Sequence, residues 1–244
     1  MRRTLIPRDK RLPLEQLAPY LLSVSDPPTP FDFAAIFDNR QPVELEVGFG
    51  KGGFLLQSAL SHPEVNYVGI ELEKALVLYV ATRLAKRGLR NARLIHGDAR
   101  RVLPLYFPDA CCQAVHVYFP DPWWKRRHKK RRLFQEDFVR HCERILQPGG
   151  QLLIASDVEE YFGVMTDLVR TQTRLQPAET PPAPTDPQWM TNFERKALQE
   201  GRSVFRAAYR KVAEEVSGQL ISGQSAGNTS QSVPSASPAA GSAL

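Results

Sequence analysis

Apolar and polar residues alternate along the chain with two different periods from about residue 43 onward. Val43, Leu45 and Val47 occupy every second position, which predicts a strand with one buried face. The residue pattern predicts helices at 54–60 and 72–87, and further strands are expected at 65–70, 91–95, 113–119 and 151–155. Strands and helices that alternate in this way predict an α/β fold with a doubly wound, mostly parallel sheet.

Several helix and strand limits can be placed from single residues. The helix at 72–87 carries Leu72, Leu76, Val80 and Leu84 at intervals of four and stops before Gly88. A later helix face is marked by Phe134, Phe138, Cys142 and Leu146 and ends at Pro148, Gly149 and Gly150. Another helix is expected over roughly 158–171, and a last strand over 203–212.

The two ends of the chain differ from this central part. Residues 1–42 are basic at the start and then proline-rich, and we expect an irregular extension that packs on or beside a domain of residues 43–216. Residues 217–244 contain no Asp, Glu, Lys or Arg and are dominated by Ser, Ala, Gly, Gln and Pro. That composition predicts a disordered tail.

Charge and cysteine content narrow the class of protein. The chain carries 32 Lys and Arg against 26 Asp and Glu, a net charge of +6 that favours an anionic partner. No apolar run is long enough to span a membrane, and the N-terminus lacks the apolar core of a secretory signal, so we expect a cytoplasmic protein. Cys111, Cys112 and Cys142 have neither a disulfide pattern nor metal-ligand spacing, so we expect core residues and no metal.

Glycines and acidic residues gather where the expected strands end. The run Gly48–Gly53 lies between a strand and a helix, which is the order of a nucleotide-binding unit. Glu71 lies 71 − 48 = 23 residues beyond Gly48, where an acid can accept hydrogen bonds from ribose hydroxyls. Asp98 can meet an adenine amino group or cap the next helix. With Glu46, Asp121 and Asp157, these acids fall on one edge of the expected sheet.

The stretch from Tyr118 to Arg132 is the most unusual part of the chain. Asp121 stands between Pro120 and Pro122, which hold it in a stiff loop. Two tryptophans follow, and then seven Lys or Arg residues in eight positions. The stretch indicates a carboxylate placed beside a surface that binds a polyanion; a strand end with a solvated basic turn is the alternative.

Two classes of nucleotide-dependent enzyme fit the glycine turn. A dehydrogenase uses the turn and the ribose acid but leaves Asp121 and the basic stretch unexplained. A methyltransferase that uses S-adenosylmethionine explains more, because Glu46, Glu71 and Asp98 are spaced to meet its amino-acid, ribose and adenine parts in turn.

Several motifs together resemble the bacterial tRNA (guanine-N7-)-methyltransferase family. In chain order they are Glu46–Gly52, Gly69–Glu71, Phe119–Trp123 with Lys125, His128 and Lys130–Arg132, Ser156–Asp157, and Thr191–Glu194. The resemblance covers roughly residues 40–212. It implies the class I S-adenosylmethionine-dependent methyltransferase (Rossmann-like) fold, and transfer of a methyl group from S-adenosylmethionine to N7 of a guanine in the variable loop of tRNA.

Roles for individual residues follow from the same motifs. Asp121 is the expected catalytic residue, and the cofactor contacts are expected from Glu46, Gly48, Gly50, Glu71, Asp98 and Asp121. Substrate contacts are implied for Lys125, Asp157, Thr191, Asn192, Phe193 and Glu194. RNA contacts are implied for Arg127, His128, Lys129, Lys130, Arg131 and Arg132.

The chemistry agrees with these residue types. Guanine N7 carries its lone pair in the ring plane, so no proton has to leave and the rate should come from positioning. The hypothesis is that Asp121, with Asp157 or Glu194, accepts hydrogen bonds from the guanine N1–H and amino groups. Two alternatives stay open: a methyltransferase acting on an exocyclic amino group, and a non-catalytic RNA-binding protein on the same fold. A monomer is favoured.

Overall fold

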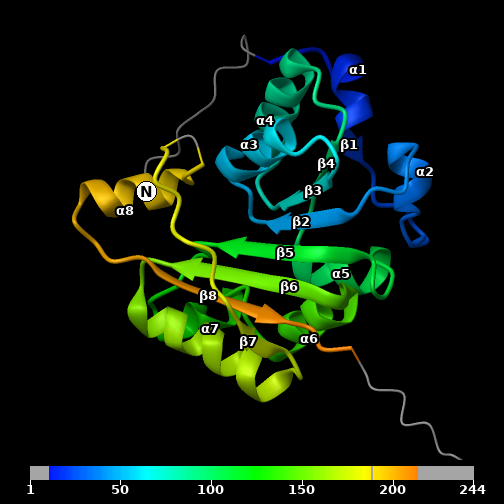
Figure 1. The fold of residues 1–244 in the computed structure, drawn as a ribbon. Helices are drawn as coiled ribbons and strands as arrows, with labels where there is room; N and C mark the ends of the chain where they lie inside the picture. The colour runs from blue at the N-terminus through cyan, green and yellow to red at the C-terminus, as the bar shows by residue number, and fades with distance from the viewer. Residues whose placement is uncertain (1–10, 188, 214–244) are drawn as a thin grey trace, which may run out of the picture. The chain divides into compact units, whose positions relative to one another are not determined.

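A computed structural model describes residues 11–187 and 189–213, which build one eight-stranded sheet with helices on both faces (Figure 1). The strands are β1 (Leu21–Leu22), β2 (Val43–Val47), β3 (Asn66–Glu71), β4 (Ala92–His96), β5 (Cys112–Tyr118), β6 (Leu146–Ser156), β7 (Gln176–Ala178) and β8 (Phe205–Arg210). The helices are α1 (Leu14–Leu17), η2 (Ala18–Tyr20), α2 (Phe33–Phe37), α3 (Gly53–Ser61), α4 (Lys74–Arg87), α5 (Ala99–Tyr106), η3 (Arg126–Arg131), α6 (Glu136–Ile145), α7 (Glu159–Gln172) and α8 (Asn192–Gln199).

The sheet order is β1-β4-β3-β2-β5-β6-β8-β7. Every pairing from β1 to β6 is parallel, and β8 joins β6 and β7 antiparallel. The central strand β2 lies between β3 and β5, so Glu46 is opposite Gly69 on one side and His116 on the other. The loops that follow these three parallel strands therefore leave the sheet at the same edge.

Two buried clusters fix the helices to the two faces. Leu45 and Val115 point to one face and pack with side chains of α5, α6 and α7. Tyr67 and Leu94 pack on the other face with side chains of α3 and α4. In Figure 1, α3 and α4 accordingly lie on the opposite side of the sheet from α6 and α7. The alternation in the sequence predicted this arrangement because a strand residue and its neighbour face opposite sides.

The expectation that residues 1–42 are irregular is wrong for the part that the structure describes. Strand β1 pairs with β4, and Leu17 and Tyr20 are buried beside α4. Phe33 and Phe37 enter the other cluster. These elements are two to five residues long, which is too short to show a period in the sequence. The domain limits at residues 42 and 216 stay predictions, and the tail expected at 217–244 lies outside the described residues.

Some of the expected limits are also corrected. Leu72 is 69% exposed because α4 begins only at Lys74. The buried side chains of α4 include Val77, Val80 and Leu84. Phe134 precedes α6, and Leu146 already belongs to β6, which runs through the Pro-Gly-Gly segment. Strand β8 was expected, whereas β7 and α8 were not.

Candidate functional site

The glycine turn joins β2 to α3 and opens outward at its first two glycines. A Cβ atom built on Gly48 or Gly50 would meet no atom within 4 Å, whereas one on Gly52 would lie 2.8 Å from Val80. Gly50 N–H donates to Glu71 Oε2 at 2.9 Å, and Glu73 N–H donates to Glu71 Oε1 at 3.0 Å. The carboxylate of Glu71 thus ties the end of β3 to the turn.

Glu46 lies under this turn and is buried, with 4% of its surface exposed. Burial raises the pKa of Glu46 to about 8, and the charge of Glu71 adds to that rise while a backbone hydrogen bond at Leu55 opposes it. Among the described residues, Glu46 Oε2 has no hydrogen-bond partner. Unpaired buried polar atoms are costly, so a buried carboxyl oxygen without a partner suits a ligand that carries a hydrogen-bond donor.

Asp98 follows β4 and caps α5. Its Oδ1 accepts a hydrogen bond from Arg100 N–H at 3.0 Å, and the residue is exposed. The capping role that the sequence allowed is therefore present. The contact of Asp98 with a cofactor stays a prediction.

The loop that carries Asp121 follows β5, the neighbour of β2, and so leaves the sheet beside the glycine turn. Its flanking residues Phe119 (φ 54°) and Trp123 (φ 41°) have left-handed backbone conformations. Each such conformation costs about 1–3 kcal/mol for a residue other than glycine and persists only where surrounding contacts impose it. Asp121 itself is exposed between them.

Arg132 supplies one of those surrounding contacts. It is only 6% exposed, its Nε–H donates to the Pro122 carbonyl at 2.7 Å, and its guanidinium lies 4.7 Å from the centre of the Tyr161 ring. Arg132 is thus less accessible than the other basic residues of the stretch whose side chains are described, and its contact with RNA stays a prediction. Arg132 holds the carbonyl that follows Asp121.

The other basic residues of this stretch whose side chains are described stay at the surface of η3 and its flanks. Lys125, Arg127, Lys129, Lys130 and Arg131 are exposed and His128 is half-buried. The guanidinium of Arg131 lies 5.2 Å from the Trp123 ring centre, and His128 meets that ring edge-on at 5.7 Å.

The two tryptophans of this loop differ in their surroundings. Trp123 is packed by its own neighbours. Trp124 is 64% exposed.

Helix α8 brings the Thr191–Glu194 segment to the same edge. A Cβ on Gly53, the first residue of α3, would lie 3.1 Å from the Met190 carbonyl oxygen, so the chain before α8 touches the glycine turn. The ring of Phe193 stacks at 6.4 Å on Phe119, which precedes Asp121. Thr191 caps the helix by accepting from Glu194 N–H at 3.1 Å. Asn192 accepts a hydrogen bond from Arg195.

Two ion pairs that the sequence did not reveal cross this edge. Asp157, just after β6, pairs with Arg202. Glu194, with 4% of its side chain exposed, pairs with Arg206 of β8. Neither arginine lies in a motif, and the pairings depend on β8 running antiparallel beside β6. The local sequence therefore does not predict these ion pairs.

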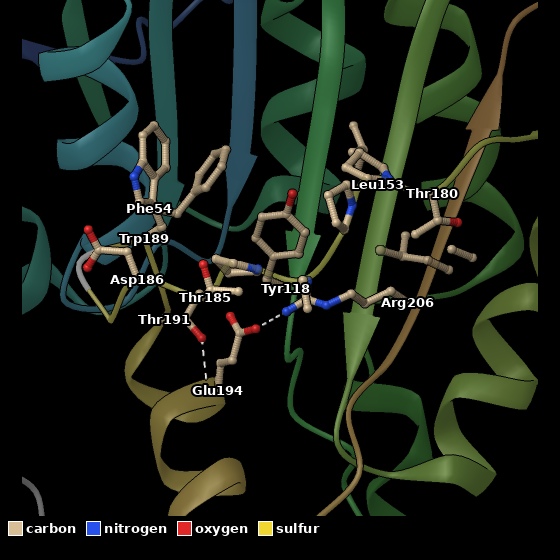
Figure 2. Close-up of a pocket in the computed structure, with 16 residues that line it drawn as sticks. Phe54, Tyr118, Leu153, Thr180, Thr185, Asp186, Trp189, Thr191, Glu194 and Arg206 are labelled. Carbon is tan, nitrogen blue, oxygen red and sulfur yellow. Dashed lines mark hydrogen bonds and ion pairs between the residues drawn. The ribbon is translucent and has the colours of Figure 1, made fainter.

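A pocket of about 560 Å³ lies between the sheet, residues 180–186 and α8 (Figure 2). Its walls are mostly apolar and include Phe54, Leu153 and Trp189. Glu194 and Arg206 meet at one end of it, where Figure 2 shows their ion pair beside Thr191. The pocket therefore combines flat apolar walls with one charged end.

A buried polar chain lies next to this pocket and was also missed. His116 bonds Glu44 at 2.9 Å through Nε2 and Tyr118 at 2.9 Å through Nδ1, under the Phe54 ring. Burial alone would raise the pKa of Glu44. The hydrogen bond from His116 and the positive charge of that ring together lower the pKa by more, so that it lies below its ordinary value. The chain orients Tyr118, the residue before the Asp121 loop.

Within residues 11–187 and 189–213, no group of three or more His, Cys, Asp or Glu side chains is arranged to hold a metal ion. Over the same residues, no helix is both long and apolar enough to cross a membrane.

Comparisons with known proteins agree with this geometry. Residues 40–207 match the family model described as "Putative methyltransferase". A tRNA (guanine-N(7)-)-methyltransferase of Rhodopirellula baltica is 36% identical over 211 residues, 82% of this chain and 77% of the relative. One of Alkalilimnicola ehrlichii is 39% identical over 186 residues, 75% of this chain and 78% of the relative.

Solved structures support the fold alone. A 16S rRNA (adenine(1408)-N(1))-methyltransferase variant from Catenulisporales acidiphilia, solved with the cosubstrate SAM, has a TM-score of 0.56 at 20% identity, over 76% of this chain and 94% of that one. The aminoglycoside resistance methyltransferase NpmB1 has a TM-score of 0.54 at 17% identity, over 78% and 95%. The expected α/β fold with a mostly parallel sheet is thereby confirmed.

Proposed function

The chain belongs to the tRNA (guanine-N(7)-)-methyltransferase family, and we propose that it transfers a methyl group from S-adenosylmethionine to N7 of a guanine in the variable loop of tRNA. One observation carries the assignment of its site. The Asp121 loop and the glycine turn follow neighbouring parallel strands, β5 and β2, so that the acid and the nucleotide-binding turn share one edge.

The residues at the turn fit S-adenosylmethionine. Glu46 offers a buried carboxyl oxygen without a partner, which suits the amino group of the methionine part. Glu71 keeps lone pairs for the ribose hydroxyls while its oxygens fix the turn. Gly48 and Gly50 face open space, so ligand atoms can approach the backbone there. Asp98 is proposed to meet the adenine.

The cofactor, when bound, supplies a methyl group activated by its positively charged sulfur. Guanine N7 attacks with its in-plane lone pair, so one N–C bond forms, one S–C bond breaks, and the positive charge passes to the purine. No proton moves in this step, and the chain therefore needs no general base for it. What the protein contributes is orientation, which can be worth up to about 7–11 kcal/mol.

Asp121 is proposed to stabilise that charge where it arrives. Its carboxylate is held at the rim by two prolines and by the Arg132 contact with Pro122, so it has little freedom to reorganise during the reaction. Preorganised charges of this kind contribute about 10²–10³-fold to turnover.

Exposed cations beside the site are proposed to bind the tRNA backbone. Arg127, Lys129 and Lys130 lie on η3, directly after the Asp121 loop, and can contact phosphates without recognising bases. Lys125 and Asn192 are proposed to meet the substrate. A cytoplasmic location and a monomer fit a tRNA-modifying enzyme and belong to the same proposal.

Incubation of the protein with labelled S-adenosylmethionine and unmodified tRNA, followed by nucleoside mapping, tests the activity. The expected product is 7-methylguanosine in the variable loop. Asp121→Ala should lower turnover about 10²–10³-fold with cofactor affinity nearly unchanged. A methyl group on an exocyclic amino group would reject the proposal, and near wild-type turnover in the variant would reject the role of Asp121.

A further inference from the structure

The charged end of the pocket contains a hydrogen-bond donor that no residue in the described part of the chain satisfies. Arg206 bonds Glu194 through Nη2, yet its Nε is buried and has no hydrogen-bond partner among the described residues. A buried N–H group without a partner is rare in proteins and expensive. Arg206 and Glu194 both line the pocket, so the buried donor belongs to a side chain of the pocket wall.

The ion pair also fixes the order of the groups that face the pocket. In a guanidinium the Nε–H and one Nη–H point in parallel from the same edge. With Nη2 engaged by Glu194 Oε1, the Nε–H lies beside a carboxylate that still has free lone pairs. A planar ligand bound against the ion pair therefore meets one hydrogen-bond donor, Arg206 Nε–H, followed by the acceptor oxygens of Glu194.

We propose that Arg206 and Glu194 together recognise the Watson–Crick edge of the target guanine. Arg206 Nε–H donates to O6, and the Glu194 carboxylate accepts from N1–H and from the 2-amino group. This order of donor and acceptors is the one that cytosine offers guanine in a base pair. The inference rests on the proposed function, because it takes the base in the pocket to be the one that is methylated.

The same arrangement excludes adenine. Its 6-amino group would place a donor against Arg206 Nε–H, and its unprotonated N1 would place an acceptor against Glu194. The Nε–H and the remaining carboxylate lone pairs would then be buried unpaired while the ion pair itself persists, and sites that leave buried polar groups unpaired discriminate most strongly, by about 10⁴–10⁵-fold. The apolar walls formed by Phe54 and Trp189 suit the faces of any base, so this selectivity comes from the ion pair.

The test replaces one atom of the substrate and one side chain of the protein. Transfer RNA is prepared with guanosine, 6-thioguanosine or adenosine at the target position; 6-thioguanosine keeps N1–H and the amino group but has a weak acceptor in place of O6. Wild type should prefer guanosine to 6-thioguanosine in kcat/KM by about 10-fold or more and should reject adenosine. Arg206→Met should lower kcat/KM for guanosine about 10–100-fold and reduce that preference to about twofold.

Arg210→Met is the matched control, since Arg210 is an exposed arginine on the same strand, β8. It should keep the wild-type preference. The dissociation constant for S-adenosylmethionine should be unchanged in both variants, and thermal melting should be unchanged in Arg210→Met but lower in Arg206→Met, which leaves the buried Glu194 unpaired. Unchanged cofactor binding by the folded variant separates base recognition from loss of the fold. If Arg206→Met does not fold, Arg206→Lys retains a positive charge beside Glu194 but lacks the parallel donors, and its preference should fall in the same way.

The outcomes are distinct. An unchanged preference for guanosine over 6-thioguanosine in Arg206→Met or Arg206→Lys would overturn the role of Arg206 while leaving the proposed function intact. A wild-type protein that methylates no guanosine-containing tRNA would overturn the proposed function, and this inference with it.

Discussion

If Glu46 receives the amino group of S-adenosylmethionine, cofactor binding must release a proton. Burial raises the pKa of Glu46 to about 8, so the side chain is about nine-tenths protonated at pH 7 in the free protein. An ammonium group binds the ionised carboxylate, and the proton has to leave first. The dissociation constant should therefore be about 10-fold weaker at pH 7, and about 100-fold weaker at pH 6, than for an ionised Glu46.

Isothermal titration of S-adenosylmethionine in buffers of different ionisation enthalpy measures both quantities. Affinity should improve about tenfold between pH 6 and pH 7, with close to one proton released, and should level off near pH 8 as the cofactor amino group (pKa about 7.7–8.0) begins to lose its charge. Glu46→Gln carries no titrating proton and should show weaker binding that does not change between pH 6 and pH 7. A flat wild-type profile without proton release would refute the assignment of Glu46.

The same pKa has a consequence for folding. Glu46 has an ordinary pKa of 4.5 when unfolded and about 8 when folded, so the folded protein holds more protons between these values. Stability then falls as pH rises from 4.5 to 8, and the group costs about 3 kcal/mol at pH 7. Glu46→Gln should accordingly melt at a higher temperature than wild type at pH 7, while binding the cofactor less well.

Two further predictions concern the residues after Asp121. Arg132→Met should destabilise the protein by about 2–4 kcal/mol and lower kcat more than it raises KM for tRNA, because a charged hydrogen bond to Pro122 and a cation–π contact with Tyr161 are lost together. Arg127→Ala, an exposed control, should change unfolding free energy by less than about 0.5 kcal/mol, and equal effects of the two would contradict this account. Filter binding of tRNA at rising salt should show that Lys130→Ala and Arg127→Ala each reduce the slope of log affinity against log salt by about 0.7–0.9, whereas an affinity independent of salt would remove these residues from the interface.

The order of strands and helices was predictable because the two hydrophobic periods differ and the central strands are long enough to show them. The placement of Glu46, Glu71 and Asp121 at one edge followed from the parallel sheet, in which every such strand ends on the same side. Helix α8 was also within reach, since Thr191 and Glu194 have the spacing of an N-terminal capping box.

The side chains that pair with the acids could not be predicted from the sequence because the pairings depend on tertiary contacts. Glu194 and Arg206 are twelve residues apart on different elements, and only the antiparallel return of β8 beside β6 brings them together. Arg132 shows the same limit in a different form. A run of seven basic residues predicts exposed side chains. Arg132, at the end of η3, is nevertheless buried and lies over the ring of Tyr161.

The charge states and partners of the acids at this edge support the role proposed for Asp121. Burial keeps Glu46 mostly uncharged in the free protein, and Asp157 and Glu194 are each balanced by an arginine. Asp121 is exposed and forms no ion pair with any side chain that the structure describes. If every acid at this edge were uncompensated, the site would stabilise the positive sulfur of the reactant as strongly as the charge developing on the purine, and binding would tighten without a gain in rate. Glu71 and Asp98 form no ion pair with a described side chain either, but both accept backbone hydrogen bonds, from Gly50 and Glu73 and from Arg100 respectively. We propose that the uncompensated charge of Asp121 lies on the side of the incoming base and favours the later position of the charge, which is the requirement for acceleration.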